Sequence, residues 1–570
     1  MKKYIECVIK SFFTIISFFI NKSFINIDRI FLLFIFISLY RMYYKYKNNN
    51  ILISIFSIFI SCVMILGKSF NIYDSTKLIS DNTILSIISF VGYYYFYNTV
   101  IGIIINKIDF KNENKKTNKK IFLVSLLTIL LSWSVYVLAF YPGILSPDPS
   151  NQILQFFNVD TKYLDSVIQL DKSVKITNHH PVLHTVLLGG CVKIGEFVNN
   201  PNLGIFLYTS LQIIFLSFTL SYTIYYLHKL NTPNIYLIFL LIIYSFVPHY
   251  VFYSMSLVKD TVYSTLIILY VIFLFDILYI KNDLKYIKTV ILLVLISLFR
   301  NNGIFVIIFS FPLLLIYKKN LRKKLTTIFL IFICLFTMYN KSLYYLKIPK
   351  GSIREALSVP FQQTARLAKY KDIDNKDKKI IDKLLNYKTL KKRYNPNISD
   401  PVKNKFNKNY TKNDLINYFK VWLKYLFKYP KIYIDSFINN TYGYFYPNTN
   451  NWYIYYKFDS RITKIIDYHY NDFNNLRNIL STYGIIFPYI PVIGLISNIG
   501  FNTLVIFLIC LMCIIFKNKK FLIVLSPLLI SIIFCLLSPV NTYFRYATSY
   551  IFSVPLLINL FLCSKKSNYV

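Results

Sequence analysis

Long apolar stretches recur along almost the whole 570-residue chain and limit its possible folds more than any single motif. About 20 consecutive apolar residues allow one helix to cross the hydrocarbon core of a bilayer. The sequence therefore predicts an all-α integral membrane protein with about 14 transmembrane helices. The expected spans are residues 5–20, 24–40, 51–67, 84–105, 121–141, 203–228, 234–253, 260–279, 286–300, 303–317, 325–345, 501–516, 521–537 and 548–562.

The composition agrees with this interpretation and excludes several classes of protein. Hydrophobic residues make up 55% of the chain and charged residues only 16%, whereas a soluble domain averages ~45–50% apolar and ~25% charged residues. A soluble enzyme, a disordered protein and a disulfide-stapled secreted domain are therefore excluded. The 8 cysteines lie mostly in apolar stretches, where cysteine packs as a small hydrophobic residue, so no disulfide framework is indicated.

Positive charge dominates the polar segments. The chain carries 64 Lys and Arg residues against 25 Asp and Glu residues, which gives a net charge of +39. Such an excess favours anionic partners. For a protein that crosses the bilayer many times, these partners are lipid head groups or phosphate-bearing substrates rather than nucleic acid. A biased residue supply, which also enriches Ile, Asn, Tyr and Phe, is an alternative source of part of the excess.

Basic residues in short loops predict the orientation, because Lys and Arg gather on the cytoplasmic side. With 14 spans all the basic loops fall on one side, so we expect a multi-pass protein of the cell membrane with both termini in the cytoplasm. A crossing at the apolar stretch 181–198 would move the later basic loops to the other side. We therefore expect this stretch to lie along or dip into the outer surface without crossing. The basic loops are Lys45–Lys47, Lys107–Lys120, Lys318–Lys324, Lys517–Lys520 and Lys565–Lys566.

The spacing of the spans divides the chain into four regions. Within the third region, residues 353–370 and 378–390 have the periodicity of short amphipathic helices. Segment 480–498 contains two prolines and is re-entrant, interfacial or spanning. The regions are an N-terminal four-helix membrane bundle (1–120), a membrane core (121–345) with a first outer loop (142–202), an extracytoplasmic helical insertion (346–500) and a C-terminal three-helix membrane segment (501–570).

Ionisable residues beside membrane spans are costly and therefore suggest function. The first is Asp148, in Tyr141-Pro-Gly-Ile-Leu-Ser-Pro-Asp-Pro-Ser150. Pro147 and Pro149 stiffen the backbone around this acid. Fixed placement suits a general base, which must lie within ~2.6–3.2 Å of the proton that it takes. The alternative is that Asp148 only caps a helix over residues 150–157.

Three of the 6 histidines lie close together in Asn178-His-His-Pro-Val-Leu-His184. His180 and His184 are spaced i, i+4 and would share one face of a helix. They would hold a divalent cation only if a carboxylate such as Asp148 or Asp160 joined them. The competing interpretations are that the histidines bind phosphate or orient a substrate, or that they are interfacial polar residues without a role.

Cationic residues follow at three further outer positions. Arginine forks and lysine ammonium groups match phosphate oxygens, so a shared anion-binding face is one interpretation. The alternatives are a neutralised charge pair at a helix start and arginines that only snorkel to the membrane surface. The residues concerned are Lys259 and Asp260 in Ser256-Leu-Val-Lys-Asp260, Arg300 in Phe299-Arg-Asn-Asn-Gly303, and Arg545 in Ser538-Pro-Val-Asn-Thr-Tyr-Phe-Arg-Tyr546.

This arrangement resembles the GT-C superfamily of glycosyltransferases, which are multi-spanning enzymes that use lipid-phosphate-linked sugars on the non-cytoplasmic side. Asp148 occupies the position of their first-loop acid. His180-Pro-Val-Leu resembles the His-Pro-Pro-Leu segment of protein-O-mannosyltransferase-like members, and Arg545-Tyr546 resembles their Arg-Tyr element. The resemblance implies a GT-C-like core. The acid stands alone, however, where several GT-C families have Asp-Glu or Asp-x-Asp, so the resemblance fixes neither a metal requirement nor the base.

The chain is also similar to an uncharacterised bacterial membrane family, domain of unknown function 6020, over about residues 121–563. That family brings no proven activity. The segments that carry the similarity are Tyr141–Asp148, Asn178–His184, Ser256–Asp260, Phe299–Gly303, Val359–Arg366, Tyr394–Val402 and Ser538–Tyr546.

The GT-C resemblance implies an inverting membrane glycosyltransferase that moves a sugar from a polyprenyl-phosphate-linked donor to a glycan, lipid or protein acceptor of the cell envelope. A divalent cation, Mg or Mn, is the one cofactor considered. The alternatives are a transporter, flippase or polymerase of lipid-linked glycans, and a non-enzymatic scaffold. The expected site consists of Asp148 as catalytic base, His179, His180, His184, Lys259, Asp260, Arg300 and Arg545 on the substrate or its phosphate, and Glu355, Gln362, Gln363 and Arg366 on the acceptor side.

Overall fold

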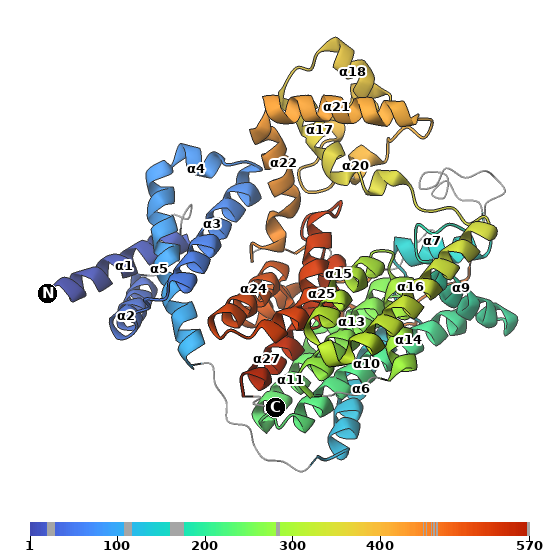
Figure 1. Ribbon diagram of the computed structural model, residues 1–570, viewed down its shortest axis with the longest axis horizontal. Coiled ribbons are helices and arrows are strands. Elements are labelled where there is room, and N and C mark those ends of the chain that lie inside the picture. Colours follow the sequence, from blue (N-terminus) through green and yellow to red (C-terminus); the bar gives the residue numbers. More distant parts are fainter. Residues whose placement is uncertain are drawn as a thin grey trace.

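The computed structural model consists of helices and the segments that connect them (Figure 1). It describes all residues except 20–28, 108–116, 160–175, 281–284, 448–449, 452, 458, 460–461, 463–465 and 567–570. Within the described residues, the only β-type pairings are isolated bridges. The all-α class predicted from the sequence is therefore confirmed.

The N-terminal helices lie at one side of the molecule (Figure 1). α1 packs against α5 at close range, because Ser17 Oγ donates to the Ser89 carbonyl at 2.9 Å and a Cβ on Gly92 would lie 2.1 Å from the Phe13 carbonyl oxygen. α3 and α5 also contribute to the main hydrophobic core of the protein. The helices are α1 (Lys2–Phe19), α2 (Arg29–Lys45), α3 (Ile51–Tyr73), α4 (Lys77–Asp81) and α5 (Thr83–Lys107).

The central bundle combines the middle and the C-terminal part of the chain around one continuous apolar core. Its helices are α6 (Lys120–Phe140), α7 (Pro147–Phe156), α9 (Val182–Phe197), α10 (Pro201–Lys229), α11 (Asn234–Phe246), α12 (Pro248–Met255), α13 (Lys259–Phe275) with the π-helical turn η2 (Asp276–Ile280), α14 (Tyr286–Phe299), α15 (Gly303–Tyr317), the 3-10 turn η3 (Lys319–Leu321), α16 (Arg322–Tyr345), α24 (Ile499–Ile515), α25 (Lys519–Leu536), α26 (Phe544–Ile551) and α27 (Val554–Lys566).

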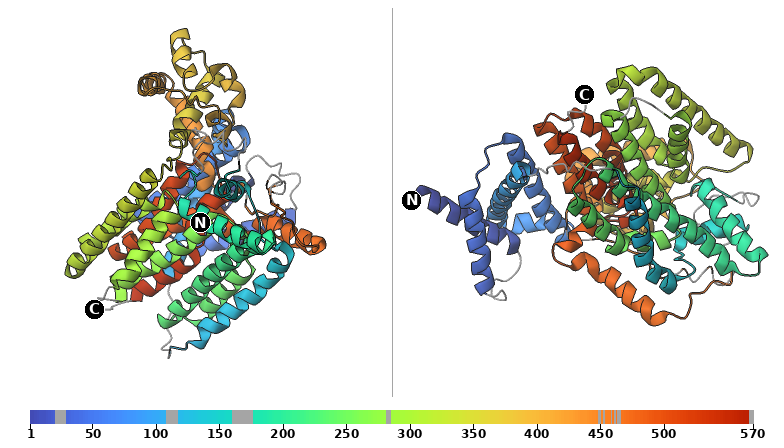
Figure 2. Two further views of the ribbon diagram at one scale, coloured as in Figure 1. Left: turned by 90° about the vertical axis from the view of Figure 1, so that its right-hand side faces the viewer. Right: turned by 90° about the horizontal axis from the view of Figure 1, so that it is seen from below.

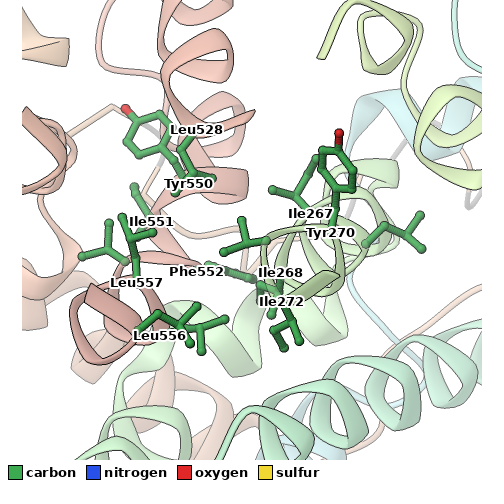
Figure 3. Close-up of a cluster of buried hydrophobic side chains, with 14 of the residues drawn as sticks. Ile267, Ile268, Tyr270, Ile272, Leu528, Tyr550, Ile551, Phe552, Leu556 and Leu557 are labelled. Carbon is green, nitrogen blue, oxygen red and sulfur yellow. The ribbon is translucent and has the colours of Figure 1, made fainter. Parts of the chain in front are cut away.

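Burial shows which helices occupy the centre of this bundle. The apolar window of Lys259–Ile280 is 83% buried and that of Phe544–Lys565 is 94% buried, whereas that of Lys120–Phe140 is only 22% buried. Figure 3 shows the apolar side chains of α13 beside those of α26 and α27. A hydrogen bond of 2.9 Å from Ser264 Oγ to Thr548 Oγ1 also fixes the register of α13 and α26.

Within the part of the chain that the structure describes, seven helices are long and apolar enough to cross a membrane, and the number rises to nine if each of two bent helix pairs counts as one span. This range is lower than the 14 expected spans. The expectation did not allow for charge and length. α1 carries four charged residues in 18, and α2 and α14 have only 17 and 14 residues. The bent pairs are α11 with α12, at 47°, and α15 with η3 and α16, at 108°.

Residues 353–441 of the long insertion stand at one end of the bundle (Figure 2, left) and have a hydrophobic core of their own, whereas residues 474–486 pack against α6 and α12. The predicted helix over 353–370 is broken after Glu355, and that over 378–390 is divided in two. Segment 480–498 forms the end of one helix and two 3-10 turns. The elements are η4 (Ile353–Glu355), α17 (Ser358–Tyr370), α18 (Asn375–Asp382), α19 (Tyr387–Arg393), α20 (Asp400–Lys403), α21 (Lys412–Lys428), α22 (Pro430–Thr441), η5 (Tyr442–Tyr444), α23 (Asn474–Ile486), η7 (Phe487–Tyr489) and η8 (Ile493–Ser497).

Candidate functional site

Charged side chains from distant parts of the chain meet where several helices begin or end. Asp148 lies in the first turn of α7, and His180 lies in the turn before α9. Lys259 and Asp260 open α13, Arg300 follows α14, and Arg545 lies in the first turn of α26.

Backbone pairing holds the loops of this site together. Ile144 N donates to the Met255 carbonyl at 2.9 Å, and Leu257 N donates to the Ile144 carbonyl at 3.2 Å. The chain can approach so closely because residue 143 is a glycine with φ of 146°, and a Cβ there would lie 2.3 Å from Thr209 Oγ1. This contact holds the start of α7, which carries the acid, beside the start of α13.

An alternating chain of ion pairs crosses the site. Arg545 Nη2 lies 2.7 Å from Asp148 Oδ2, and Arg545 Nε lies 3.2 Å from Asp260 Oδ2. Arg300 Nη1 approaches the other oxygen of Asp260, Oδ1, at 3.5 Å. One guanidinium thus joins the two carboxylates, and the inner carboxylate aligns both arginines.

The solvent exposure of the side chains differs along this series of ion pairs. The Asp260 side chain is only 2% exposed and those of Arg545 and Arg300 are 8% and 14% exposed, whereas Asp148 is 25% exposed. A molecule that enters the site can therefore reach the Asp148 carboxylate, whereas Asp260 serves to hold the arginines. The direct substrate contact that the sequence predicts for Asp260 does not fit this burial.

The histidine nearest to the acid is held by a lysine. Lys259 Nζ lies 3.0 Å from His180 Nδ1, and His180 Nε2 lies 4.0 Å from Asp148 Oδ1. An ammonium group can only donate, so Nδ1 accepts and the proton of the neutral imidazole is on Nε2, which faces Asp148. Burial, followed by the charge of Lys259, lowers the pKa of His180 well below 6.5, so the ring is neutral at pH 7.

The same surroundings keep the acid ionised. Burial alone would raise the pKa of Asp148, but the charge of Arg545, followed by His180 and Lys259, outweighs burial and holds the pKa well below its usual value. Asp148 is also not the N-cap that the alternative interpretation required. Helix α7 begins at Pro147, its N-cap is Ser146, and the Asp148 side chain is directed to Arg545.

The predicted shared face of His180 and His184 is wrong. Helix α9 begins only at Val182, because Pro181 ends the preceding extended turn, and His184 Nδ1 pairs with Gln152 Oε1 at 3.0 Å. Among the residues that the structure describes, no group of three or more His, Cys, Asp or Glu side chains is arranged to hold a metal ion. Asp160, the other carboxylate considered for such a site, lies outside the described residues.

Glu355 is the one acceptor-side candidate beside the histidines. His179 and Glu355 are close enough for each to shift the pKa of the other. Burial would raise the pKa of Glu355, but the ammonium group of Lys403, followed by His179, lowers it. The segment is anchored where Asn178 N donates to the Pro349 carbonyl at 2.9 Å.

The other three acceptor-side candidates are buried in the packing of the insertion. Gln363 Nε2 donates to the Tyr433 carbonyl at 3.3 Å, and Gln362 donates to the Asn395 carbonyl. Arg366 pairs with Asp435 at 3.4 Å and donates to the Asp74 carbonyl at 3.0 Å, so it joins the insertion to the end of α3. These contacts give the three residues a structural role, and the structure does not bring them to the Asp148 cluster.

Sequence reasoning missed two groups of residues around the site. Tyrosine rings cover the arginines: the Arg300 guanidinium lies 5.2 Å from the Tyr263 centroid, and that of Arg545 lies 5.5 Å from the Tyr546 centroid. Lys403 was missed because it lies deep in the insertion, although it directly follows the Ser399–Val402 motif. The sequence does indicate one of the tyrosines, since Tyr546 is adjacent to Arg545.

Comparison with known proteins gives one match. A family model described as a family of unknown function, DUF6020, matches residues 38–569. The match extends into the N-terminal helices, beyond the segments that carry the similarity in the sequence. No curated protein and no solved structure matches the chain.

Proposed function

This chain belongs to the DUF6020 family, whose function is unknown, and we propose that it is a membrane glycosyltransferase that uses a polyprenyl-phosphate-linked sugar donor and a cell-envelope acceptor. The observation that carries the proposal is the Asp148–Arg545–Asp260–Arg300 chain of ion pairs, with Lys259 beside it. It combines one accessible carboxylate with three fixed cations, which is the set of groups that this reaction needs.

The cations suit the phosphate of the donor. Arg300, Arg545 and Lys259 contribute three positive charges, and the two carboxylates contribute two negative charges, so the cluster carries +1 with neutral imidazoles. Helices α7, α13 and α26 also begin here, and the N-terminus of a helix attracts anions. A phosphate that develops negative charge as it leaves is stabilised by such prearranged groups.

Donor binding and base activation are linked in this proposal. While Asp148 is paired with Arg545 its pKa is low, and it is a weak base. A donor phosphate competes for the Arg545 guanidinium and weakens the 2.7 Å ion pair. The Asp148 carboxylate is then free to accept a proton from the acceptor, so the base acts when the donor is present.

The transfer step follows from these positions. The acceptor hydroxyl oxygen attacks the anomeric carbon of the sugar from the side opposite the phosphate, and its proton passes to Asp148. The bond between the anomeric carbon and the phosphate oxygen breaks, and polyprenyl phosphate leaves with the electron pair, so the configuration inverts. The His180 Nε2–H group orients the donor or acceptor, and the region around Glu355 receives the acceptor.

The proposed orientation places this site at the outer face of the cell membrane, in a GT-C-like core with 14 crossings and both termini in the cytoplasm. Support comes from the basic segments, since residues 517–520 and Lys565 line one cavity at the other end of the bundle. Lys and Arg gather on the cytoplasmic side. In this arrangement α1, α2, α14 and α24 are short spans.

The test is genetic complementation in the native host, which works whichever sugar is transferred. Deletion of the gene is expected to remove a surface glycan that mass spectrometry detects, and the wild-type chain is expected to restore it. Asp148→Asn is expected to lower the transfer rate by about 10²–10⁴-fold, because the general base is lost. A membrane-fraction assay with labelled polyprenyl-phosphate sugars then measures the rate.

The matched control is Asp372→Asn, which removes an exposed carboxylate of the insertion and should restore the glycan fully. Both variants must reach wild-type levels in the membrane. If Asp148→Asn restores the glycan at the wild-type rate, the base assignment is wrong.

A transporter or flippase is the second candidate, because the bent pair α11–α12 leads directly into the Ser256–Lys259 segment of the site. Broken helices beside a polar site are typical of transporters. Reconstituted vesicles separate the two functions. A flippase moves a labelled lipid-linked sugar between leaflets without breaking the sugar–phosphate bond, whereas a transferase, or a polymerase that shares this site, releases polyprenyl phosphate.

A further inference from the structure

A second polar site lies at the end of the bundle away from Asp148. It is a cavity of about 370 Å³ between the ends of five helical segments. Helix α13 and its π-helical turn connect the two sites: Lys259 lies at the first and Tyr279 at the second. At 1.5 Å per residue this separation is about 30 Å. The lining residues are Tyr279, Tyr317, Phe516, Lys517, Asn518, Lys519, Lys520, Ser564 and Lys565.

The charge of this cavity has one sign. Four of its lining residues are lysines, and the described residues of the lining include no Asp or Glu. Lys318 lies nearby, since burial and the charge of Lys520 lower its pKa. Ammonium groups that lie near one another repel, and an anion between them reduces this repulsion.

The cavity also has an ordered polar floor. The Tyr279 hydroxyl donates to Asn518 Oδ1 at 2.6 Å, and Asn518 Nδ2 donates to Ser564 Oγ at 2.9 Å. These bonds connect α13, α25 and α27 at one point. The Lys565 ammonium lies 4.0 Å from the centre of the Phe516 ring, which sets its position. The arrangement therefore differs from a loose group of surface lysines.

The rim of the cavity adds aromatic surface. Tyr317 and Phe516 are 40% and 38% exposed, and each ends a strongly apolar helix, α15 or α24. Aromatic rings at the ends of apolar helices lie at the level of the lipid head groups. A ligand in the cavity would thus have its anionic group among the lysines and an apolar part beside the rings.

We propose that this cavity binds a phosphate ester, and that the head group of an anionic phospholipid is its source. Basic pockets between the ends of membrane helices bind such head groups. A soluble phosphate ester has the same anionic group but lacks an apolar part that could contact the aromatic rings at the rim. This inference does not depend on the proposed function, because no residue of the cavity belongs to the Asp148 site.

The experiment compares two variants of the full-length protein with equal loss of charge. Lys517→Gln/Lys520→Gln/Lys565→Gln removes three lysines of the cavity, and Lys388→Gln/Lys391→Gln/Lys392→Gln removes three exposed lysines of the insertion. Each protein, in neutral detergent, is titrated with short-chain phosphatidylglycerol, with phosphatidylcholine of the same chain length and with inorganic phosphate. Native mass spectrometry counts the ligands that remain bound.

The expected result is that the cavity variant binds phosphatidylglycerol roughly 100-fold more weakly than the wild type, because each lysine near an anionic head group contributes a factor of about five. The insertion variant should bind as the wild type does.

The titrations with different ligands identify the source of the phosphate. If inorganic phosphate binds as tightly as phosphatidylglycerol and depends on the same lysines, the cavity takes a soluble phosphate, and the lipid source is rejected. If both triple variants bind every ligand as the wild type does, or if phosphatidylcholine binds equally well, the anion site itself is rejected.

Discussion

The two ends of the bundle both collect positive charge, but they hold it in different ways. At the Asp148 end, two buried arginines alternate with two carboxylates in fixed ion pairs. At the other end, lysines surround a cavity whose described lining has no acid. The planar guanidinium group of a buried arginine holds its hydrogen-bond donors in one fixed arrangement. The ammonium group of an exposed lysine is instead a point charge on a flexible side chain.

This difference separates two tasks. Fixed, paired charges position a reacting group and depend little on salt, because the interior is poorly screened. Exposed lysines attract an anion of variable shape, and salt weakens that attraction. The comparison predicts that mutation of the first cluster disturbs stability and chemistry together. Mutation of the second cluster should change binding alone.

The largest expected effect is that of Arg545→Ala. Loss of the guanidinium leaves Asp148 and Asp260 without their shared partner in a buried site, which costs about 3–5 kcal/mol of stability. Thermal unfolding of the purified protein measures this loss. Arg322→Ala is the control, because that side chain is exposed and its hydrogen bond within the described residues goes to a backbone carbonyl, that of Leu315.

Asp148→Asn in the Arg545→Ala background should recover part of the lost stability, since it removes the carboxylate that has lost its arginine, whereas Asp260 keeps Arg300. If Arg545→Ala unfolds at the same temperature as Arg322→Ala, the buried chain of ion pairs does not hold the site together.

A smaller effect is expected from pH. Burial, followed by the charge of Lys259, lowers the pKa of His184 to about 3, whereas in the unfolded chain it is ~6.5. The unfolded state therefore takes up the proton first as the pH falls. The stabilising contribution of neutral His184 is complete above pH ~6.5, decreases below it, and amounts to a loss of about 2 kcal/mol at pH 5.

Melting temperatures of the wild type and of His184→Gln between pH 7.5 and 5 test whether stability falls with pH as predicted. The variant should lose less stability over this interval, because one titrating group is gone while His179 and His180 remain. Equal pH dependence of the two proteins would contradict a buried neutral His184.

The smallest effect is expected at the lysine end. Lys517→Gln/Lys519→Gln should change the free energy of unfolding by less than about 0.5 kcal/mol in neutral detergent, since both side chains are exposed. At low salt the variant should be slightly more stable than the wild type, because repulsion between like charges is reduced. A loss as large as that of Arg545→Ala would show that the two ends do not differ as described.

The helical class and the proximity of the site residues follow from simple sequence features. Apolar stretches predict the helices, and the alternating direction of successive helices puts Asp148, Lys259, Arg300 and Arg545 at the same end of the bundle. Residues that share one end of a bundle can meet even when they are far apart in the chain. The structure brings these four together, and their chemical roles remain predictions.

Other features depend on contacts that periodicity does not encode. Pro181 delays the start of α9, so the i, i+4 spacing of His180 and His184 does not put them on one face. Tertiary packing directs Gln362 and Gln363 into the insertion, although their helix is amphipathic as predicted. The number of crossings also depends on more than apolar stretches, because charge and helix length limit which helices are long and apolar enough to span, and seven to nine of the described helices are.

The paired prolines around Asp148 have one further consequence. Pro147 and Pro149 lie in the first turn of α7, where a missing N–H group disturbs no helical hydrogen bond, and their rings restrict the backbone dihedrals on both sides of the acid. The position of the carboxylate is thus set during folding, and in the proposed reaction substrate binding need not supply the entropy of aligning it. Replacement of these rings by flexible residues should slow the proposed sugar transfer in a protein that still assembles and melts normally.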